Sequence, residues 1–136
     1  MPATPLSDLA VLLASMRPEL HAGIWAWCAL PPGASADGVE AIATMREAEG
    51  TTVVVAEADA DARGWPAVFR SAWITLTVRS DLAAVGLTAA FARALADAGI
   101  ACNVIAGVHH DHLFVPVDRA ADAMAALQAL QARSAA

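Results

Sequence analysis

The chain has 136 residues, with 14 acidic and 8 basic side chains, so its formal net charge is −6. A composition that is 58% hydrophobic and only 16% charged excludes intrinsic disorder. No apolar run reaches the roughly 18 to 20 residues that a membrane span needs, which excludes a transmembrane protein. All basic residues are arginines scattered along the chain, and they form no stripe that would bind nucleic acid. The length therefore predicts one compact domain or two small lobes.

The two cysteines, Cys28 and Cys102, lie far apart and in apolar runs. This setting favours buried free thiols over a disulfide or a reactive thiol. The N-terminus lacks the basic region and the long apolar stretch of a signal peptide. A cytoplasmic protein is the simplest interpretation.

The first half predicts a helix followed by strands. Apolar residues recur at helical spacing over Ser7 to Ser15, where Ser7 is the expected N-cap and Pro18 ends or kinks the helix. Alternation then predicts a strand over Ile24 to Leu30. The other expected elements of this half are a loop over 31–38, a short strand over 41–45, a turn at 49–50, a strand over 51–56 and a helix over 57–63.

The second half has a clearer pattern. It predicts a strand over 72–78, a helix over 82–98 that Gly99 ends, strands over 101–106 and 112–117, and a helix over 119–132 that Asp118 caps. This order of strand, helix, strand, strand and helix is a ferredoxin-like unit without its last strand. The first half supplies the missing strand or forms a degenerate second copy. The predicted fold is therefore α+β, with two lobes at 1–68 and 69–136, each an antiparallel sheet with helices on one side.

Four segments resemble a known family. Residues 72–90 resemble the first strand, loop and helix of an ACT domain, and residues 95–104 resemble its continuation. The motifs REAEGTT at 46–52 and HDHLFVP at 110–116 resemble signatures of small stand-alone bacterial ACT-domain proteins. The resemblance covers about residues 7 to 130 and extends to the ACT repeats of aspartate kinases and of arginine-sensing tandem proteins. It implies a βαββαβ fold and a regulatory module that binds a free amino acid.

The segment between the 72–78 strand and the following helix is the best ligand site, because a helix N-terminus suits a carboxylate. The resemblance implies that the ligand's ammonium group meets backbone carbonyls of the neighbouring strand. Asn103 both donates and accepts, and Asp81 accepts from an ammonium or guanidinium group. A second interpretation is that Ser80 or Asp81 only caps the helix. The predicted ligand-binding residues are Arg79, Ser80, Asp81, Leu82, Ala84, Val85, Gly86, Asn103, Val104, Ile105, His110, Asp111 and His112.

The run His109 to His112 also suggests zinc or nickel binding. In a strand, however, His110 and His112 share one face while His109 and Asp111 share the other, so at most two ligands converge. A hairpin connection is favoured, and we predict no metal and no cofactor.

Two further sets of residues each allow a structural and a functional interpretation. Arg46, Glu47 and Glu49 form a polar group that is either a surface ion pair beside a turn at Gly50, or one in which Arg46 and Glu49 bridge the lobes or reach the ligand. The tryptophans at 25, 27, 65 and 73 are expected to fill the core or a dimer face rather than to stack on a cofactor.

The sequence therefore predicts a non-catalytic regulatory protein. No nucleophile elbow and no phosphate-binding glycine loop with its lysine is present, which excludes a kinase. The expected partners are a free amino acid or similar small ligand, a second copy of the chain in a homodimer, and a regulated protein of unknown identity. The alternatives are an interaction module without a ligand and a metal-binding protein that uses the HHDH segment.

Overall fold

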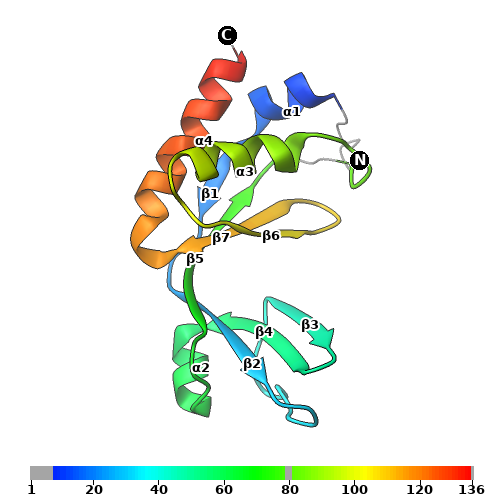
Figure 1. Ribbon diagram of the computed structural model, residues 1–136, viewed down its shortest axis with the longest axis vertical. Coiled ribbons are helices and arrows are strands. Elements are labelled where there is room, and N and C mark those ends of the chain that lie inside the picture. Colours follow the sequence, from blue (N-terminus) through cyan, green and yellow to red (C-terminus); the bar gives the residue numbers. More distant parts are fainter. Residues whose placement is uncertain (1–7, 79–80, 136) are drawn as a thin grey trace. The chain divides into compact units, whose positions relative to one another are not determined.

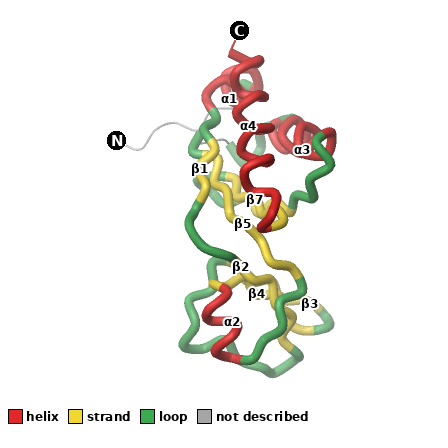
Figure 2. The backbone as a smooth tube through the Cα atoms, turned by 90° about the vertical axis from the view of Figure 1, so that its left-hand side faces the viewer, coloured by secondary structure: helices red, strands yellow, loops and turns green. Residues whose placement is uncertain are grey.

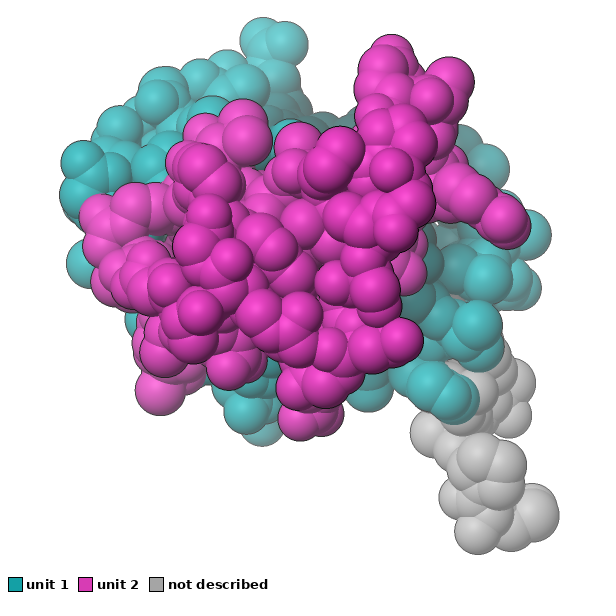
Figure 3. Space-filling model, turned by 90° about the horizontal axis from the view of Figure 1, so that it is seen from below, with its two compact units in different colours: residues 1–21, 73–136 teal, residues 22–72 magenta. Residues whose placement is uncertain are grey.

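The computed structural model describes residues 8–78 and 81–135. By its internal contacts the chain forms two compact units, which are coloured separately in Figure 3. Unit 1 consists of residues 1–21 and 73–136, and unit 2 consists of residues 22–72. Unit 2 is therefore inserted in the sequence of unit 1.

Unit 1 contains the elements at both ends of the chain. A short strand of the N-terminal segment pairs antiparallel with β5, with Pro18 opposite Leu76 and Leu20 opposite Ile74. The bounds are α1 Leu9–Ser15, β1 Pro18–Leu20, β5 Phe69–Leu76, α3 Leu87–Asp97, β6 Asn103–Ala106, β7 Asp111–Pro116, the 3-10 helix η1 Val117–Arg119 and α4 Ala120–Ala135.

The strand order in unit 1 is β1-β5-β7-β6. This is the order of a ferredoxin-like sheet, with β1 in the place of the last strand. The prediction that the first half supplies the missing strand is thereby confirmed. Figures 1 and 2 show α1, α3 and α4 on the same side of these strands. The predicted α+β, ferredoxin-like class with helices on one side is also confirmed for this unit.

Unit 2 repeats the same topology in reduced form. Its elements are β2 Trp25–Leu30, β3 Ala43–Glu47, β4 Gly50–Ala56, α2 Glu57–Arg63 and the first residues of β5. The hydrogen-bonded order is β3-β4-β2-β5, with Trp25 opposite both Ala56 and Ser71. A loop replaces the first helix of the ferredoxin-like plan, so the degenerate second copy is confirmed as well.

Alternation along β2 builds the core of unit 2. Ala26, Cys28 and Leu30 are buried and pack with residues of β4 and with Ala60 of α2. Trp27 lies on the other face of the strand and makes an edge contact with Phe69, with ring centroids 6.3 Å apart. The predicted two-faced strand is therefore observed.

The core of unit 1 lies between its helices and its strands. Leu12, Phe91, Leu95, Leu113 and Leu127 are all fully buried, and they come from α1, α3, β7 and α4. Burial of these large apolar side chains is the main stabilising contribution in such a unit. The core thus fixes α3 against β7, which positions the site described below.

The first helix ends at Ser15, as predicted, but its N-cap differs from the prediction. Asp8 caps it, because its carboxylate accepts a hydrogen bond from the Val11 N–H at 3.1 Å. The predicted cap Ser7 lies outside the described residues. The helix ends at Ser15, and Pro18 begins β1 instead of ending the helix. Proline is tolerated there because it is the first residue of a short strand.

The helix predicted from Leu82 begins only at Leu87. The Asp81 carboxylate accepts from the Ala83 N–H at 2.9 Å, and the Asp81 carbonyl accepts from the Ala84 N–H at 2.9 Å. These bonds close a turn instead of a helix. Gly86, with a φ of 104°, is the N-cap residue. The interpretation that Asp81 caps the helix is wrong, and Ser80 lies outside the described residues.

The predicted division at residue 68 concerned two sequence repeats. The spatial division differs, because residues 8–21 belong by contact to the unit that contains residues 73–135. The boundary between the two repeats stays a prediction. No helix in the described part of the chain is long and apolar enough to cross a membrane.

Candidate ligand pocket

A small pocket of about 60 Å³ lies within unit 1, beside the start of α3. Three segments of unit 1 contribute to it: the turn after β5, the first turn of α3, and the β6–β7 hairpin. Its lining brings together four of the predicted ligand-binding residues, which are Asp81, Leu82, Ala84 and Asp111. The helix pocket, as we call it, is lined by Asp81, Leu82, Ala84, Leu87, Thr88, Ala106 and Asp111.

The N-terminus of α3 has no side-chain cap. Gly86 offers no side chain to accept from the first turn, and that turn contains no acidic residue. The N–H groups at the start of an α-helix lack helical partners and carry the positive end of the helix dipole. Leu87 and Thr88 of this turn line the helix pocket, which therefore has one electropositive wall.

Asp111 also lines the helix pocket. It is the first residue of β7, lies across the hairpin from Ala106, and is only 7% exposed. Burial raises the pKa of this carboxyl, and the nearby charge of His110 acts in the opposite direction. Within residues 8–78 and 81–135, its side chain forms no hydrogen bond or ion pair. A buried acid without a partner is unusual, and such groups concentrate at functional sites.

His112 lies in a different environment from Asp111. Its Nδ1 accepts a hydrogen bond from the Trp73 Nε1–H at 3.1 Å and lies 3.0 Å from the Thr75 hydroxyl. That hydroxyl also lies 2.7 Å from Nε2 of His21, whose ring stacks on Trp73 at 3.6 Å. Neighbouring residues of a strand point to opposite faces, so Asp111 and His112 do not share a site.

The indole bond fixes the protonation state of His112. Because Trp73 Nε1 only donates, Nδ1 of His112 must accept, and the ring is neutral with its proton on Nε2. Burial lowers the pKa of His112, and the charges of His110 and His21 lower it further. We call His21, Trp73, Thr75 and His112 the histidine cluster. Trp73 and Thr75 lie in the region predicted as a strand over 72–78, but His21 was not predicted as their partner.

The other predicted ligand residues lie away from the lining of the helix pocket. Asn103 is exposed and pairs with Phe114, at the end of β6 opposite to Ala106. Val104 and Ile105 follow it along the strand, and Val85 is 85% exposed in the turn before α3. Their contact with a ligand stays a prediction, as does that of Gly86 and His110. Arg79 and Ser80 lie outside the described residues.

Leu87, Thr88 and Ala106 were not predicted as site residues. The sequence pattern placed Leu87 and Thr88 inside a longer helix, where their N–H groups would be bonded to the preceding turn. Because α3 begins only after Gly86, the N–H groups of Leu87 and Thr88 have no preceding helical turn to bond to. The glycine before this Leu-Thr pair was a weak sequence signal for that helix start. Ala106 has no side chain that marks a function.

The HHDH segment does not form a metal site. Among the described residues, no group of three or more His, Cys, Asp or Glu is arranged to hold a metal ion. His109 and His110 lie in the hairpin turn with ring centroids 6.5 Å apart, whereas His112 belongs to the histidine cluster. The hairpin interpretation of this segment is confirmed by the pairing of Ala106 with Asp111.

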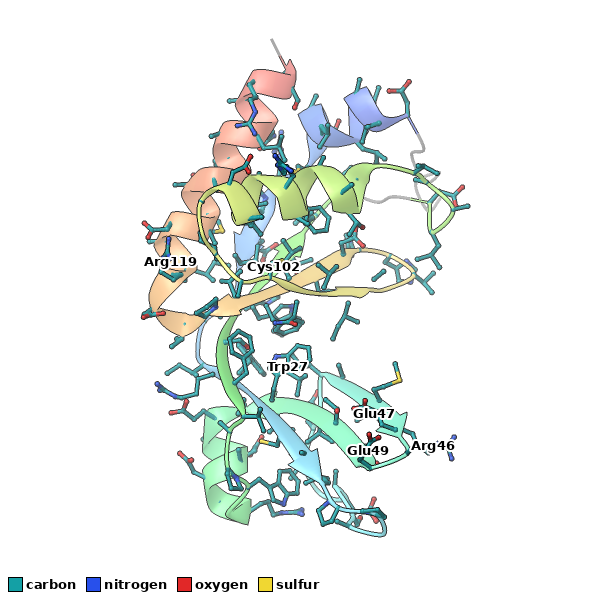
Figure 4. The ribbon with its side chains drawn as sticks, in the orientation of Figure 1. Trp27, Arg46, Glu47, Glu49, Cys102 and Arg119 are labelled. Atoms are coloured by element: carbon teal, nitrogen blue, oxygen red, sulfur yellow. The ribbon has the colours of Figure 1, made fainter. Side chains whose placement is uncertain are left out.

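A larger hollow of about 280 Å³ lies in unit 2, at the β3–β4 hairpin. Figure 4 shows the Arg46 side chain extending away from Glu47 and Glu49. Arg46 forms no ion pair among the residues that the structure describes, so the predicted ion pair with Glu49 is not observed. The hairpin pocket, as we call it, is lined by Ala29, Leu30, Glu47, Glu49, Gly50, Thr51 and Thr52.

The cysteines are free, as expected. Cys28 is 2% exposed, and burial raises the pKa of its thiol. Cys102 is partly buried, which raises the pKa of its thiol to about 11. Both thiols are therefore protonated at neutral pH and are poor nucleophiles.

Comparison with known proteins identifies the family. Models described as "ACT domain" match residues 4–72 and 68–129. A Vibrio cholerae protein of unknown function is 47% identical, with a TM-score of 0.81, over 90% of this chain and 95% of that one. The chain belongs to the ACT-domain family.

Two further solved structures resemble this ACT-domain protein in fold. The ligand-free regulatory subunit of aspartate kinase from Thermus thermophilus is 12% identical, covers 83% of this chain and 95% of its own, and has a TM-score of 0.66. An Agrobacterium tumefaciens protein is 15% identical over 85% of this chain and 89% of its own, with a TM-score of 0.63. No curated protein matches the sequence. Family and fold together indicate a regulatory, ligand-binding class of protein.

Proposed function

We propose that this ACT-domain protein is a non-catalytic regulator that binds a free amino acid in the helix pocket. The observation that carries the proposal is the pairing of two complementary walls around one cavity. One wall is the uncapped first turn of α3 at Leu87 and Thr88, and the other includes the buried carboxyl of Asp111. Such convergent polar groups in a concave site are typical of ligand recognition.

The regulatory part of the proposal follows from the class of fold. A ligand shifts a conformational equilibrium only if it binds two states with different affinities. A homodimer, a cytoplasmic location and a regulated partner protein remain part of the proposal. Among the described residues, the Thr88 hydroxyl and the Asp111 carboxyl that line the helix pocket make no hydrogen bond to each other, which is consistent with a binding role.

The experiment is a thermal-unfolding screen of metal-stripped protein against the twenty common amino acids. A ligand at about 100 times its dissociation constant adds about 2.7 kcal/mol to the free energy of unfolding. That is worth several degrees in Tm for a chain of this size. One selective shift supports the proposal and names the ligand. No shift with any amino acid at millimolar concentration contradicts it and favours an interaction module without a ligand.

A further inference from the structure

We propose that Asp111 is the specificity-determining counter-ion of the helix pocket, and that it recognises the ammonium group of an α-amino acid. The ligand's ammonium group binds the Asp111 carboxylate, and its carboxylate binds the first-turn N–H groups of α3. This inference rests on the function proposed above and deepens it. It assigns the ammonium group to a side chain, whereas family resemblance alone assigns it to strand carbonyls.

The first argument is the isolation of Asp111. The residue is only 7% exposed, yet its side chain makes no hydrogen bond or ion pair with any described residue. Burying an acid without a partner costs free energy, either as desolvated charge or as a forced proton. The hydrophobic neighbours Leu113 and Val115 on the same strand show that an apolar residue is readily accommodated along β7. An external cation explains why a carboxyl stands here.

The second argument is the positive end of the α3 helix dipole, which borders the same pocket. Leu87 and Thr88 present the start of an 11-residue helix that has no side-chain cap and no acid in its first turn. This end of a helix favours an anion. A ligand with an anion and a cation on adjacent atoms matches both poles, and the α-amino acid head group is the simplest such ligand.

The third argument concerns charge and size. The lining contains two acids, Asp81 and Asp111, whose negative charges disfavour an acidic ligand side chain. The Asp81 carboxylate is already engaged by the Ala83 N–H. A volume of about 60 Å³ corresponds to roughly two waters and holds little beyond a head group. The ligand side chain therefore extends past Leu82, which is 62% exposed.

This geometry predicts that ligand binding is coupled to the protonation state of Asp111. Burial favours the neutral form of Asp111 in the free protein, and a bound ammonium group favours the charged form. Binding therefore lowers the pKa of Asp111 and weakens as the solution is acidified through that pKa. Among the described residues, the charged groups near Asp111 are His110 from the hairpin and Asp81 from the turn before α3.

The main test compares matched probes by NMR titration of the 15N-labelled full chain. The probes are L-alanine, L-serine and L-leucine, each paired with the 2-hydroxy acid that replaces its ammonium group by a hydroxyl. We expect at least one amino acid to bind about tenfold or more tightly than its hydroxy acid, because a charge-assisted hydrogen bond is lost. Asp111→Asn should remove that preference. The control Asp97→Asn alters an exposed acid that pairs with Arg93 and should keep it.

The outcomes separate this inference from the proposed function. Equal binding of an amino acid and its hydroxy acid, or a preference that survives Asp111→Asn, overturns the role of Asp111 and leaves amino-acid binding standing. Binding of none of the probes, together with a flat thermal screen, overturns both.

Two further measurements need no ligand. The Asp111 carboxyl carbon, followed by NMR against pH in the wild-type protein, should titrate above the ordinary range of an aspartate. The Asp111→Asn protein without ligand should also have a Tm equal to or higher than the wild type, because an unpaired buried acid is replaced by a neutral isostere. A depressed pKa, or a Tm several degrees lower in Asp111→Asn, would show that the carboxylate has a structural partner and would overturn the inference.

Discussion

The hairpin pocket of unit 2 and the helix pocket of unit 1 differ in whether hydrogen bonds and steric contacts within the fold account for the residues that line them. The hairpin pocket is the larger, yet its glutamates are exposed and Glu47 accepts a hydrogen bond from the Thr52 hydroxyl. Gly50 is explained by sterics alone, because a Cβ atom there would lie 2.0 Å from the Leu30 carbonyl oxygen. The helix pocket is smaller, but it contains an acid, 7% exposed, that makes no hydrogen bond or ion pair with any described residue. Volume is thus a weaker guide to function than an unexplained polar group.

The same contrast separates the two family motifs. The REAEGTT motif at 46–52 is accounted for by a turn, a close backbone approach and one side-chain bond. In the HDHLFVP motif at 110–116, Leu113, Phe114 and Val115 are core residues. His112 belongs to the histidine cluster, whereas Asp111 makes no hydrogen bond or ion pair with any described residue.

The largest expected effect is a loss of stability when Gly50 of the hairpin pocket is substituted. Gly50→Ala places a Cβ atom against the Leu30 carbonyl at a φ of 142°, so we expect a loss of about 3 kcal/mol in the free energy of unfolding. Chemical denaturation measures it. The control Gly33→Ala also has a positive φ, of 83°, but meets no atom within 4 Å, and should cost only about 1 kcal/mol. Equal losses in the two variants would mean that the close approach is absent.

A smaller effect is expected beside the helix pocket. Gly86 has a φ of 104°, and a Cβ atom there would lie 2.9 Å from a terminal methyl carbon of Leu9. Because that methyl can move, Gly86→Ala should cost about 1 to 2 kcal/mol, mostly from the backbone conformation. Adding Leu9→Ala tests this division, measured by the same denaturation curves. If the second substitution restored wild-type stability, the steric contact and not the backbone would be the cause.

The other end of α3 is held by Arg119. Its guanidinium donates to the carbonyl oxygens of Ala98 at 3.2 Å and Gly99 at 3.4 Å, and its Nε–H donates to Asp122 at 3.0 Å. Figure 4 labels its side chain near the start of α4. Arg119→Met should cost about 1 kcal/mol, because these bonds are partly exposed. The Tm of the variant measures it, and an unchanged Tm would show that the bonds do not persist in solution.

The smallest effect is a pH dependence from the histidine cluster. The folded-state pKa of His112 lies below its ordinary 6.5, so the unfolded chain binds more protons just below pH 6.5. Stability from this group is present above pH 6.5 and is lost as the pH falls through the lowered folded pKa. Unfolding curves collected between pH 7 and pH 5 should therefore show decreasing stability, and His112→Gln should reduce the slope. A slope that His112→Gln leaves unchanged would assign it to other groups.

Periodicity and turn residues allowed much of the fold to be predicted. The strand at 25–30, the helix at 57–63 and the hairpin before Asp111 follow from alternation, Gly64 and the HHDH turn. The strand β1 could not be predicted, because three residues that begin with proline carry no period and pair only through tertiary contact with β5. The resemblance to ACT domains contributed the two-copy plan, which the sequence pattern alone left open.

The candidate site was predicted in part. Asp81, Leu82, Ala84 and Asp111 were named, and they do line one pocket. Asn103 was chosen for its hydrogen-bonding capacity, but strand register places it three residues from Ala106, at the far end of the hairpin. Register and burial decide which polar residue faces a ligand, and neither can be obtained from residue type alone.

The most direct test of the account is a map of where an amino acid binds. We expect the amide signals of Leu87, Thr88, Ala106 and Asp111 to shift and saturate together when the amino acid identified by the thermal screen is titrated into the 15N-labelled protein. The signals of Glu47, Glu49 and Thr51 in the hairpin pocket should stay unchanged. Saturable shifts confined to the hairpin pocket, with the helix pocket silent, would contradict the assignment of the ligand site to the first turn of α3 and Asp111.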